Sequence, residues 1–286
     1  EREKINKENN EINKLIDSLN DILSSKDQRM NIIKDELNNI KDKYGDKRRS
    51  EIEHSAEEFT VEDMIPDEDM VITVSHQGYL KRTSLDEYRT QGRGGLGARG
   101  VKTKDDDFNE HLFIASTHNY LLIFTEYGKI FWKKVWEIPE GSKVSKGRAI
   151  QNLINIETGD NIRSIITITN LTDEDYLNNN YLVMCTEGGT VKKTKLEAYS
   201  RPRVNGIYAI TIKENDRLLD VKLTNGDNHI IIAKKSGKAI NFHENNVRPM
   251  GRTASGVRGV RLENSEDKVI GMICVAREES DLLVVS

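Results

Sequence analysis

The residues best suited to chemistry on a charged ligand lie between positions 91 and 100. Four of the seven residues from 91 to 97 are glycine, and Arg93 stands among them. Glycine lets the backbone approach a phosphate closely, and successive N–H groups can then hold an anion. Arg93 could add a bidentate phosphate contact. No Gly-Lys-Ser/Thr follows, so the segment is not a nucleotide-binding P-loop; the alternative to phosphate binding is a plain connector between structural units.

Lysines and arginines recur at similar positions after a series of glycine turns. They are Lys81, Arg82, Lys133, Lys134, Lys146, Arg148, Lys192, Lys193, Arg201, Arg203, Arg252 and Arg258, with Arg99 and Lys102 just after the glycine-rich segment. In a ring of repeats, residues at equivalent positions of successive repeats lie at the same height along the ring axis. We therefore predict that these cations form a positive band along one rim. Such a band suits a polyanion held through its phosphates, with salt-sensitive and nearly sequence-independent binding. For any single residue, the alternative is a solvated charge at a strand end.

Other kinds of chemistry find little support in the sequence. The six histidines show no metal-ligand or triad spacing, so we expect no metal site and no catalytic residue. Cys185 and Cys274 lie in apolar runs, which favours buried thiols over a disulfide. No apolar run approaches the roughly 18 residues of a membrane span, and no signal peptide opens the chain. We therefore expect a fragment of a cytoplasmic protein.

The charge is distributed unevenly along the 286 residues. The whole chain has a formal net charge of −4, and residues 1–64 hold 12 Lys and Arg against 17 Asp and Glu. The remainder is nearly neutral. Nucleic-acid binding would therefore require its cations to be segregated onto one face.

The elements that must position these cations are short strands in an internal repeat. Strand-like runs are separated by the turn pairs Gln77-Gly78, Tyr127-Gly128, Gly188-Gly189 and Ser236-Gly237, which favour two-residue hairpins. The second residues of these pairs are 50, 61 and 48 residues apart. Periods of about 40–50 residues with several short strands indicate propeller-type blades. The fold class is therefore mainly β, a propeller-like pinwheel of repeated four-stranded blades; a β-sandwich is the alternative.

The repeat also sets the expected domain limits. Residues 1–46 show apolar stripes at three- and four-residue spacing, with Ser25 and Gln28 as a capping box between two helices. Residues 47–66 read as a charged linker, and residues 67–286 as the β-pinwheel, ending within a fifth blade. The long third interval is explained by an Asp- and Asn-rich insertion at 173–180, which we expect to be a surface loop.

These features together resemble the C-terminal region of the DNA gyrase A subunit family. The similarity runs essentially from end to end and includes Ser75-His76-Gln77-Gly78-Tyr79-Leu80-Lys81, Val191-Lys192-Lys193-Thr194, and Met250-Gly251-Arg252-Thr253-Ala254-Ser255-Gly256-Val257-Arg258. The family's gyrase box reads Gln, basic, Arg, Gly, Gly, basic, Gly. Gln91, Arg93, Gly94, Gly95 and Gly97 match it, whereas Gly92 and Leu96 replace the two basic positions. That departure weakens the distinction from topoisomerase IV, whose A subunit lacks an intact box.

The resemblance implies a DNA-binding and DNA-wrapping domain of a type II topoisomerase, which gives direction to ATP-dependent negative supercoiling. Arg93 and the backbone of residues 94–97 would anchor the DNA, and the rim cations would continue its path. The alternatives are a topoisomerase IV domain that bends DNA for decatenation and a propeller-like protein-binding scaffold. The full-length protein would be the enzyme, with its catalytic tyrosine upstream of these residues. Its implied partners are double-stranded DNA, the gyrase B subunit with the ATP and Mg²⁺ sites, and a second A subunit in an A2B2 complex in the bacterial cytoplasm.

Overall fold

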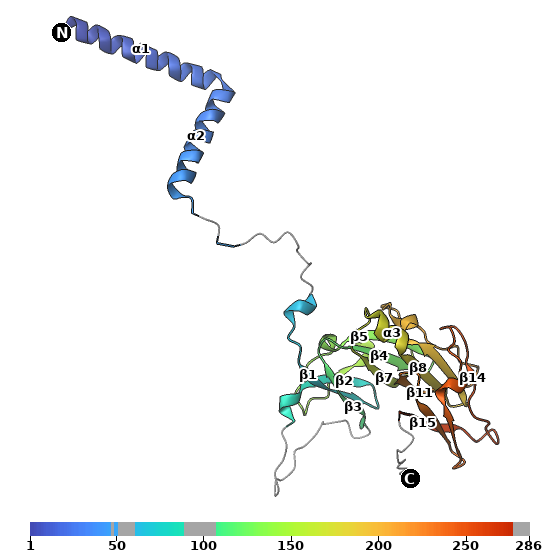
Figure 1. The fold of residues 1–286 in the computed structure, drawn as a ribbon. Coiled ribbons are helices and arrows are strands. Elements are labelled where there is room, and N and C mark those ends of the chain that lie inside the picture. Colours follow the sequence, from blue (N-terminus) through green and yellow to red (C-terminus); the bar gives the residue numbers. More distant parts are fainter. Residues whose placement is uncertain (47–48, 51–60, 89–106, 277–286) are drawn as a thin grey trace. The chain divides into compact units, whose positions relative to one another are not determined.

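The computed structural model describes residues 1–46, 49–50, 61–88 and 107–276. Its contacts divide the chain into two units, Glu1–Glu58 and Phe59–Ser286. The first unit holds α1 (Arg2–Ser24) and α2 (Lys26–Tyr44) (Figure 1). Ser25 separates them, and its hydroxyl accepts a hydrogen bond from the Gln28 amide at 3.4 Å, which confirms half of the predicted capping box. The Ser25 amide donates to the Asp21 carbonyl at 3.1 Å instead of to the Gln28 side chain. No helix among the described residues is long and apolar enough to cross a membrane.

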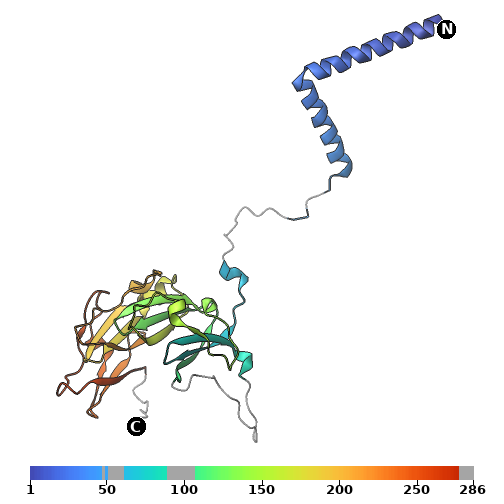
Figure 2. The same cartoon turned by 180° about the vertical axis from the view of Figure 1, so that it is seen from behind.

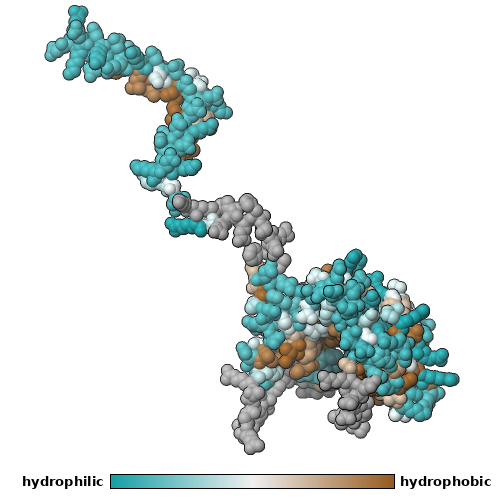
Figure 3. Space-filling view, in the orientation of Figure 1, coloured by the Kyte–Doolittle hydropathy of each residue, from teal (hydrophilic) through white to brown (hydrophobic). Residues whose placement is uncertain are grey.

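The two helices keep their apolar stripe at the surface. Neither helix contains a buried residue. The exposed apolar side chains are Ile5, Ile12, Leu15, Ile16, Leu19 and Leu23 in α1, and Met30, Ile32, Ile33, Leu37 and Ile40 in α2. Brown patches on the helices mark part of this stripe in the space-filling view (Figure 3).

The described part of the second unit is built from four antiparallel sheets that follow one another in chain order (Figures 1 and 2). The first sheet has the order β3-β1-β2-β6, formed by β1 (Asp69–Ser75), β2 (Tyr79–Ser84), β3 (Asn109–Ser116) and β6 (Arg148–Ala149). The second has the order β7-β4-β5-β10, formed by β4 (Tyr120–Thr125), β5 (Lys129–Lys134), β7 (Ile162–Ile168) and β10 (Ile207–Tyr208). The predicted mainly β fold is confirmed.

The remaining two sheets continue the pattern. The third has the order β11-β8-β9-β14, formed by β8 (Tyr181–Thr186), β9 (Thr190–Lys195), β11 (Leu218–Thr224) and β14 (Val257–Arg258). The fourth has the order β15-β12-β13, formed by β12 (His229–Lys234), β13 (Ala239–His243) and β15 (Val269–Val275). Short 3-10 helices complete the unit: η1 (Val61–Met64), η2 (Leu85–Glu87), η3 (Val135–Glu137), η4 (Ile150–Asn152), η5 (Leu196–Tyr199) and η6 (Glu244–Asn246).

The core lies between successive sheets, because side chains alternate along each strand. In β8, Leu182 and Met184 pack in the cluster shared with the second sheet, whereas Val183 and Cys185 pack in the cluster shared with the fourth. This two-sided burial explains why the first strand of each repeat reads as a continuous apolar run. Cys185 and Cys274 are free thiols, and burial raises the pKa of each to about 12.

Each of the first three sheets takes its last strand from the following repeat. β6 pairs with β2, β10 with β5, and β14 with β9. The residues just before these strands are Gly147, Gly206 and Gly256, which have φ values of 78°, 65° and 97°. A Cβ atom at these positions would lie 2.6–2.8 Å from the carbonyl oxygens of Leu80, Ile130 and Val191. Glycine is therefore required by both the backbone conformation and the close approach of the two chain segments.

An aspartate ties each hairpin turn to the start of the strand at the edge of the sheet opposite the exchanged strand, which is β3, β7, β11 or, in the fourth sheet, β15; we call these four the inner strands. The carboxylates of Asp107, Asp160, Asp216 and Asp267 accept hydrogen bonds from the turn amides of Gln77, Tyr127, Gly188 and Ser236, respectively, at 2.7–3.1 Å. The turn glycines that follow all have φ near +80° (Gly78, Gly128, Gly189 and Gly237), as the predicted hairpins require. We call these four carboxylates the turn aspartates.

The insertion at 173–180 is not the loop that the sequence suggested. It contains the helix α3 (Glu174–Asn179), which begins at Asp173, whose side chain accepts the Tyr176 amide at 3.1 Å. Leu177 is buried in the cluster between the second and third sheets. Tyr176 packs against the same cluster, so an N-cap and two neighbouring apolar contacts hold this polar segment on the protein.

Candidate nucleic-acid interface

The connections that enter the exchanged strands carry most of the exposed predicted cations. We call residues 139–149, 200–208 and 249–258 the inter-repeat loops. Exposed side chains among them include Lys146, Arg148, Arg201, Arg203 and Arg258, and Arg252 is half-buried. No carboxylate of the described residues is found in an ion pair with any of these six. Because β6, β10 and β14 are edge strands, the loop cations lie at the outer edge of three consecutive sheets.

Two of the predicted rim lysines are interior residues. Lys81 donates to the carbonyl oxygens of Ser142 at 2.9 Å and Lys143 at 2.7 Å. Lys192, at the same position after its turn glycine, donates to the carbonyl oxygens of Ala209, at 2.6 Å, and Arg252. Burial lowers the pKa of Lys81, and it lowers the pKa of Lys192 to about 8. These lysines fasten inter-repeat loops to the preceding sheet, so their ammonium groups do not face solvent.

Lys193 is a third interior residue. Its ammonium group lies 2.8 Å from the Glu244 carboxylate, and both side chains are almost fully buried. Glu244 also accepts from the Thr224 hydroxyl and the Asn228 amide. Burial raises the pKa of Glu244, but the hydrogen bonds from Lys193, Asn228 and Thr224 outweigh it and hold the pKa below its ordinary value. The ion pair therefore joins the third sheet to the fourth instead of forming part of a rim.

The other strand-borne cations are paired with carboxylates. Arg82 donates to the Ile138 carbonyl and pairs with Glu140 at 3.2 Å. Lys133 pairs with Glu137 at 3.1 Å, and Lys134 pairs with Glu62 at 2.5 Å while lying 3.8 Å from the centre of the Tyr120 ring. Their charge is largely compensated, so among the non-interior predicted rim cations in the described residues, those without a carboxylate partner lie on the inter-repeat loops. The whole predicted gyrase box, residues 91–97, lies outside the described residues, as do Arg99 and Lys102.

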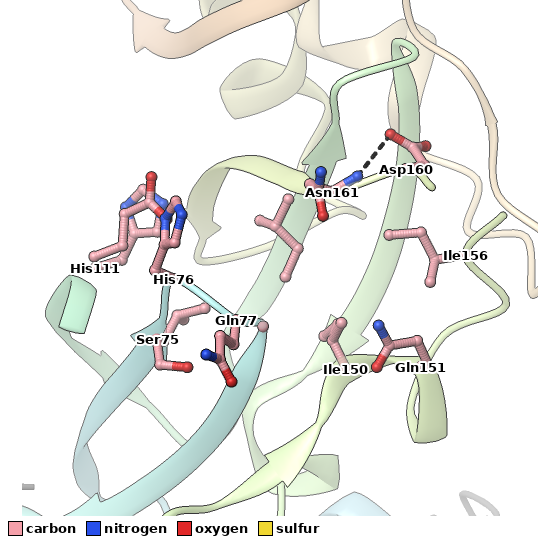
Figure 4. Close-up of a pocket in the computed structure, with 13 residues that line it drawn as sticks. Ser75, His76, Gln77, His111, Ile150, Gln151, Ile156, Asp160 and Asn161 are labelled. Atoms are coloured by element: carbon pink, nitrogen blue, oxygen red, sulfur yellow. Dashed lines mark hydrogen bonds and ion pairs between the residues drawn. The ribbon is translucent and has the colours of Figure 1, made fainter. Parts of the chain in front are cut away.

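Two cavities lie among the sheets and their connecting segments, and neither suits a nucleotide. One, of about 20 Å³, lies between the first two sheets, with His76 and His111 on one side and Asp160 and Asn161 on the other (Figure 4). It has room for about one water molecule. The other is a cleft of about 210 Å³ lined by Trp132, Leu153 and Val204 among others. No group of three or more His, Cys, Asp or Glu in the described ranges could hold a metal ion.

Sequence reasoning missed two kinds of residue that the structure singles out. The turn aspartates do not stand out in the sequence, because their hydrogen bonds span about 30 residues and leave no local pattern. Apolar residues at the tips of the inter-repeat loops were also missed. Val204 is 91% exposed, the largest fraction for any large apolar residue in the described part of the chain.

The consecutive antiparallel sheets and their exchanged edge strands define a propeller-type repeat protein with a cationic outer edge. The family model described as the DNA gyrase C-terminal domain, beta-propeller, matches residues 69–116, 119–169, 180–225 and 229–276. The chain belongs to this family.

Named relatives and solved structures agree with this assignment. The DNA gyrase A subunit of Salmonella typhimurium (strain LT2) is 40% identical over 244 residues, which cover 85% of this chain and 27% of the relative. The chain thus spans about a quarter of that relative's length. A crystal structure of the C-terminal domain of DNA topoisomerase IV is 30% identical, with a TM-score of 0.61, and the match covers 75% of this chain and 64% of that one. A structure of the DNA gyrase A C-terminal domain is 26% identical, with a TM-score of 0.57 and coverages of 72% and 65%.

Proposed function

We propose that this chain binds and wraps double-stranded DNA as the C-terminal region of a gyrase A subunit. The observation that carries the proposal is the set of uncompensated cations on three consecutive inter-repeat loops: Lys146, Arg148, Arg201, Arg203, Arg252 and Arg258. Smoothly bending a 20–30 bp duplex costs on the order of 1–6 kcal/mol. Phosphate contacts distributed over successive sheets offset that cost, and the glycine-rich residues 91–97 would add an anchor through Arg93.

In the whole protein, this domain would supply direction to a type II topoisomerase. A DNA segment wrapped around the domain crosses the cleaved duplex with a fixed handedness. Passing that segment through the break therefore lowers the linking number. The catalytic tyrosine would be contributed by residues upstream of this chain, and ATP and Mg²⁺ would be bound by the B subunit in an A2B2 complex. The protein would act on the bacterial chromosome in the cytoplasm. The 40% identity to a gyrase A subunit supports this assignment.

A topoisomerase IV type of domain, which bends DNA without a full wrap, is the second candidate. Gly92 and Leu96 occupy the two positions where the gyrase box has basic residues. The 30% identity to a topoisomerase IV C-terminal domain also favours it. The two candidates share the DNA interface and differ in the topology that binding imposes.

Removing one arginine from each inter-repeat loop tests the shared interface. In the variant Arg148→Ala/Arg203→Ala/Arg258→Ala, we expect weaker binding to duplex DNA and a smaller salt dependence. Each lost phosphate contact lowers the slope of log K against log salt by about 0.9, or about 2.7 for three. Affinity is measured by fluorescence anisotropy at several salt concentrations.

The matched control is Lys4→Ala/Lys7→Ala/Lys14→Ala in α1, which removes the same charge from exposed positions. It should retain the slope of the unmodified chain. Equal slopes for the arginine variant and the unmodified chain would contradict the proposed interface.

A further inference from the structure

Each inter-repeat loop contains a tight turn with a β-branched residue exposed at its tip. The turns are closed by amide-to-carbonyl hydrogen bonds from Ser145 to Ser142 at 3.0 Å, from Gly206 to Arg203 at 3.0 Å, and from Ala254 to Gly251 at 3.1 Å. Their tip residues are Val144, Val204 and Thr253, all exposed. Val144 is 51% exposed and Val204 is 91% exposed. Val144 and Thr253 are the third residues of their turns and Val204 is the second residue of its turn, so each loop exposes a β-branched side chain at a central position of a tight turn.

A cation immediately precedes every one of these tips. The pairs are Lys143-Val144, Arg203-Val204 and Arg252-Thr253, and we call them the tip pairs. Their arrangement places a positive charge and a small branched apolar group side by side on a short turn. The combination recurs in three loops whose other residues differ, so it does not follow from overall similarity of the loop sequences.

The scaffold holds the tips in place. The carbonyl oxygens of Lys143 and Arg252, the cations of the first and third tip pairs, accept the interior ammonium groups of Lys81 and Lys192. The glycine that follows each tip, at 147, 206 or 256, is fixed by its positive φ and by contact with the preceding sheet. The first and third turns are thus anchored on both sides and the second at its glycine, and a ligand would meet preorganised side chains.

We propose that the tip pairs act as shallow wedges: Val144, Val204 and Thr253 enter the minor groove where the duplex bends, while the preceding cations bind the flanking phosphates. This rests on the proposed DNA-binding function and deepens it. Apolar side chains that press between base steps from the minor groove kink DNA toward the major groove. A tight turn fits the narrow minor groove, whereas the wider major groove admits a helix or a β-ribbon. The duplex would therefore be bent at intervals set by the repeats.

Such contacts have a signature that phosphate contacts lack. The 2-amino group of guanine projects into the minor groove and obstructs a wedge there. Replacing guanine by inosine removes this group without altering the phosphates or the major-groove acceptors. A protein that only contacts phosphates can respond to the replacement through the altered deformability of the duplex, but that response would persist in a variant that lacks the tip side chains.

The test compares two duplexes of the same sequence, one with guanine and one with inosine. Binding of the 286-residue chain is measured by anisotropy, and DNA bending by energy transfer between dyes at the two ends. The variant is Val144→Ser/Val204→Ser/Thr253→Ser, which removes the branched methyl groups from solvent-exposed turns where serine is well tolerated. The control is Leu112→Ser/Ile114→Ser/Ile270→Ser, at three apolar sites of 55–60% exposure on β3 and β15. Circular dichroism checks that each variant is folded.

We expect the unmodified chain and the control to prefer inosine DNA by about tenfold and to bend it more. The tip variant should lose the preference to within about twofold and bend the DNA less, with an unchanged salt slope. The inference fails if the tip variant keeps the preference and the bend, or if the unmodified chain binds with a strong salt dependence and shows no preference. Absence of any DNA binding by the unmodified chain would instead overturn the proposed function, and this inference with it.

Discussion

Residues of one type have different roles in this chain, depending on how deeply the fold places them. Lys81, Lys192 and Lys193 belong to the same predicted set of recurring cations as the exposed arginines, yet their ammonium groups are bonded to carbonyl or carboxylate oxygens inside the protein. Arg148, Arg203 and Arg258 remain exposed. Buried cations stabilise the attachment of the loops, and exposed cations are available to a polyanion. The two groups should therefore respond to substitution in different assays.

Lys192→Met should reduce stability while leaving surface charge almost unchanged. The substitution removes the donor to the Arg252 carbonyl, and an unpaired buried acceptor costs about 1–3 kcal/mol. The free energy of unfolding is measured in urea at pH 7. The exposed neighbour Lys195→Met is the control and should change stability by less than about 0.5 kcal/mol. Equal stabilities of the two variants would show that the Lys192 contacts contribute little.

The same residue predicts a pH dependence. The pKa of Lys192 is about 8 in the folded protein against an ordinary value of 10.5, because burial disfavours the charged form. Between these pH values the unfolded chain binds more protons than the folded one, so stability rises with pH across this interval. The rise should be present in the unmodified chain and smaller in Lys192→Met, when urea unfolding is repeated at several pH values.

At the scale of elements, the exchanged strands join each sheet to the next repeat. A two-residue strand such as β10 has few hydrogen bonds of its own, so its position depends on the glycine before it and on the sheet it joins. Gly206 supplies the positive φ, and the chain there approaches the Ile130 carbonyl and the Phe131 ring closely. These contacts also orient the loop that carries Arg201 and Arg203.

Gly206→Ala should therefore be more damaging than alanine at another glycine with positive φ. Its Cβ would lie 2.7 Å from Phe131 and 2.8 Å from the Ile130 carbonyl, whereas a Cβ at Gly237, with φ of 80°, meets nothing within 4 Å. Both variants incur the conformational cost of about 1 kcal/mol or more. Only Gly206→Ala should lose further stability and weaken DNA binding. Thermal unfolding measures the loss of stability, and fluorescence anisotropy measures the DNA affinity. If the two variants behaved alike, the close contacts at Gly206 would not be needed to position β10.

At the scale of the whole molecule, successive sheets share apolar cores, so the inter-repeat loops are positioned relative to one another through the protein interior. A wrap requires contacts distributed over several repeats, whereas a local bend needs only one or two. The distinction between a gyrase type and a topoisomerase IV type of domain is therefore a property of the set of loops, and no single cation decides it.

Closing a relaxed plasmid with ligase in the presence of the chain should leave a change in linking number. This change is expected if the duplex is wrapped around the protein with a fixed handedness, because ligation of the plasmid retains the writhe of the wrap. The products are resolved on a gel after the protein is removed. The variant Arg148→Ala/Arg203→Ala/Arg258→Ala serves as the control, and closure in its presence should leave a smaller change in linking number. DNA binding without any trapped change would favour the alternative domain, which bends without wrapping.

The local elements were predictable because their signals lie within a few residues. Ser25 and Gln28 mark the boundary between α1 and α2, and the predicted turn pair Tyr127-Gly128 lies between β4 and β5. The inner strands β3, β7, β11 and β15 were not individually recognised, because each follows a polar connection and is paired with a strand far back in the chain. The helix α3 was missed since its composition resembles a loop, and its apolar contacts with the core come from two neighbouring residues, Tyr176 and Leu177.

By itself, the sequence determined the repeat, the turn glycines, the β class and the recurrence of cations, since periodicity and turn chemistry are local properties of the chain. It also carried the family resemblance that the comparisons confirmed. Tertiary structure alone decided which cations face solvent, which strand completes which sheet, and how the turn aspartates close the hairpins. Those outcomes depend on contacts between residues roughly 30 to 80 positions apart, where burial supplies or removes hydrogen-bond partners that no short pattern encodes.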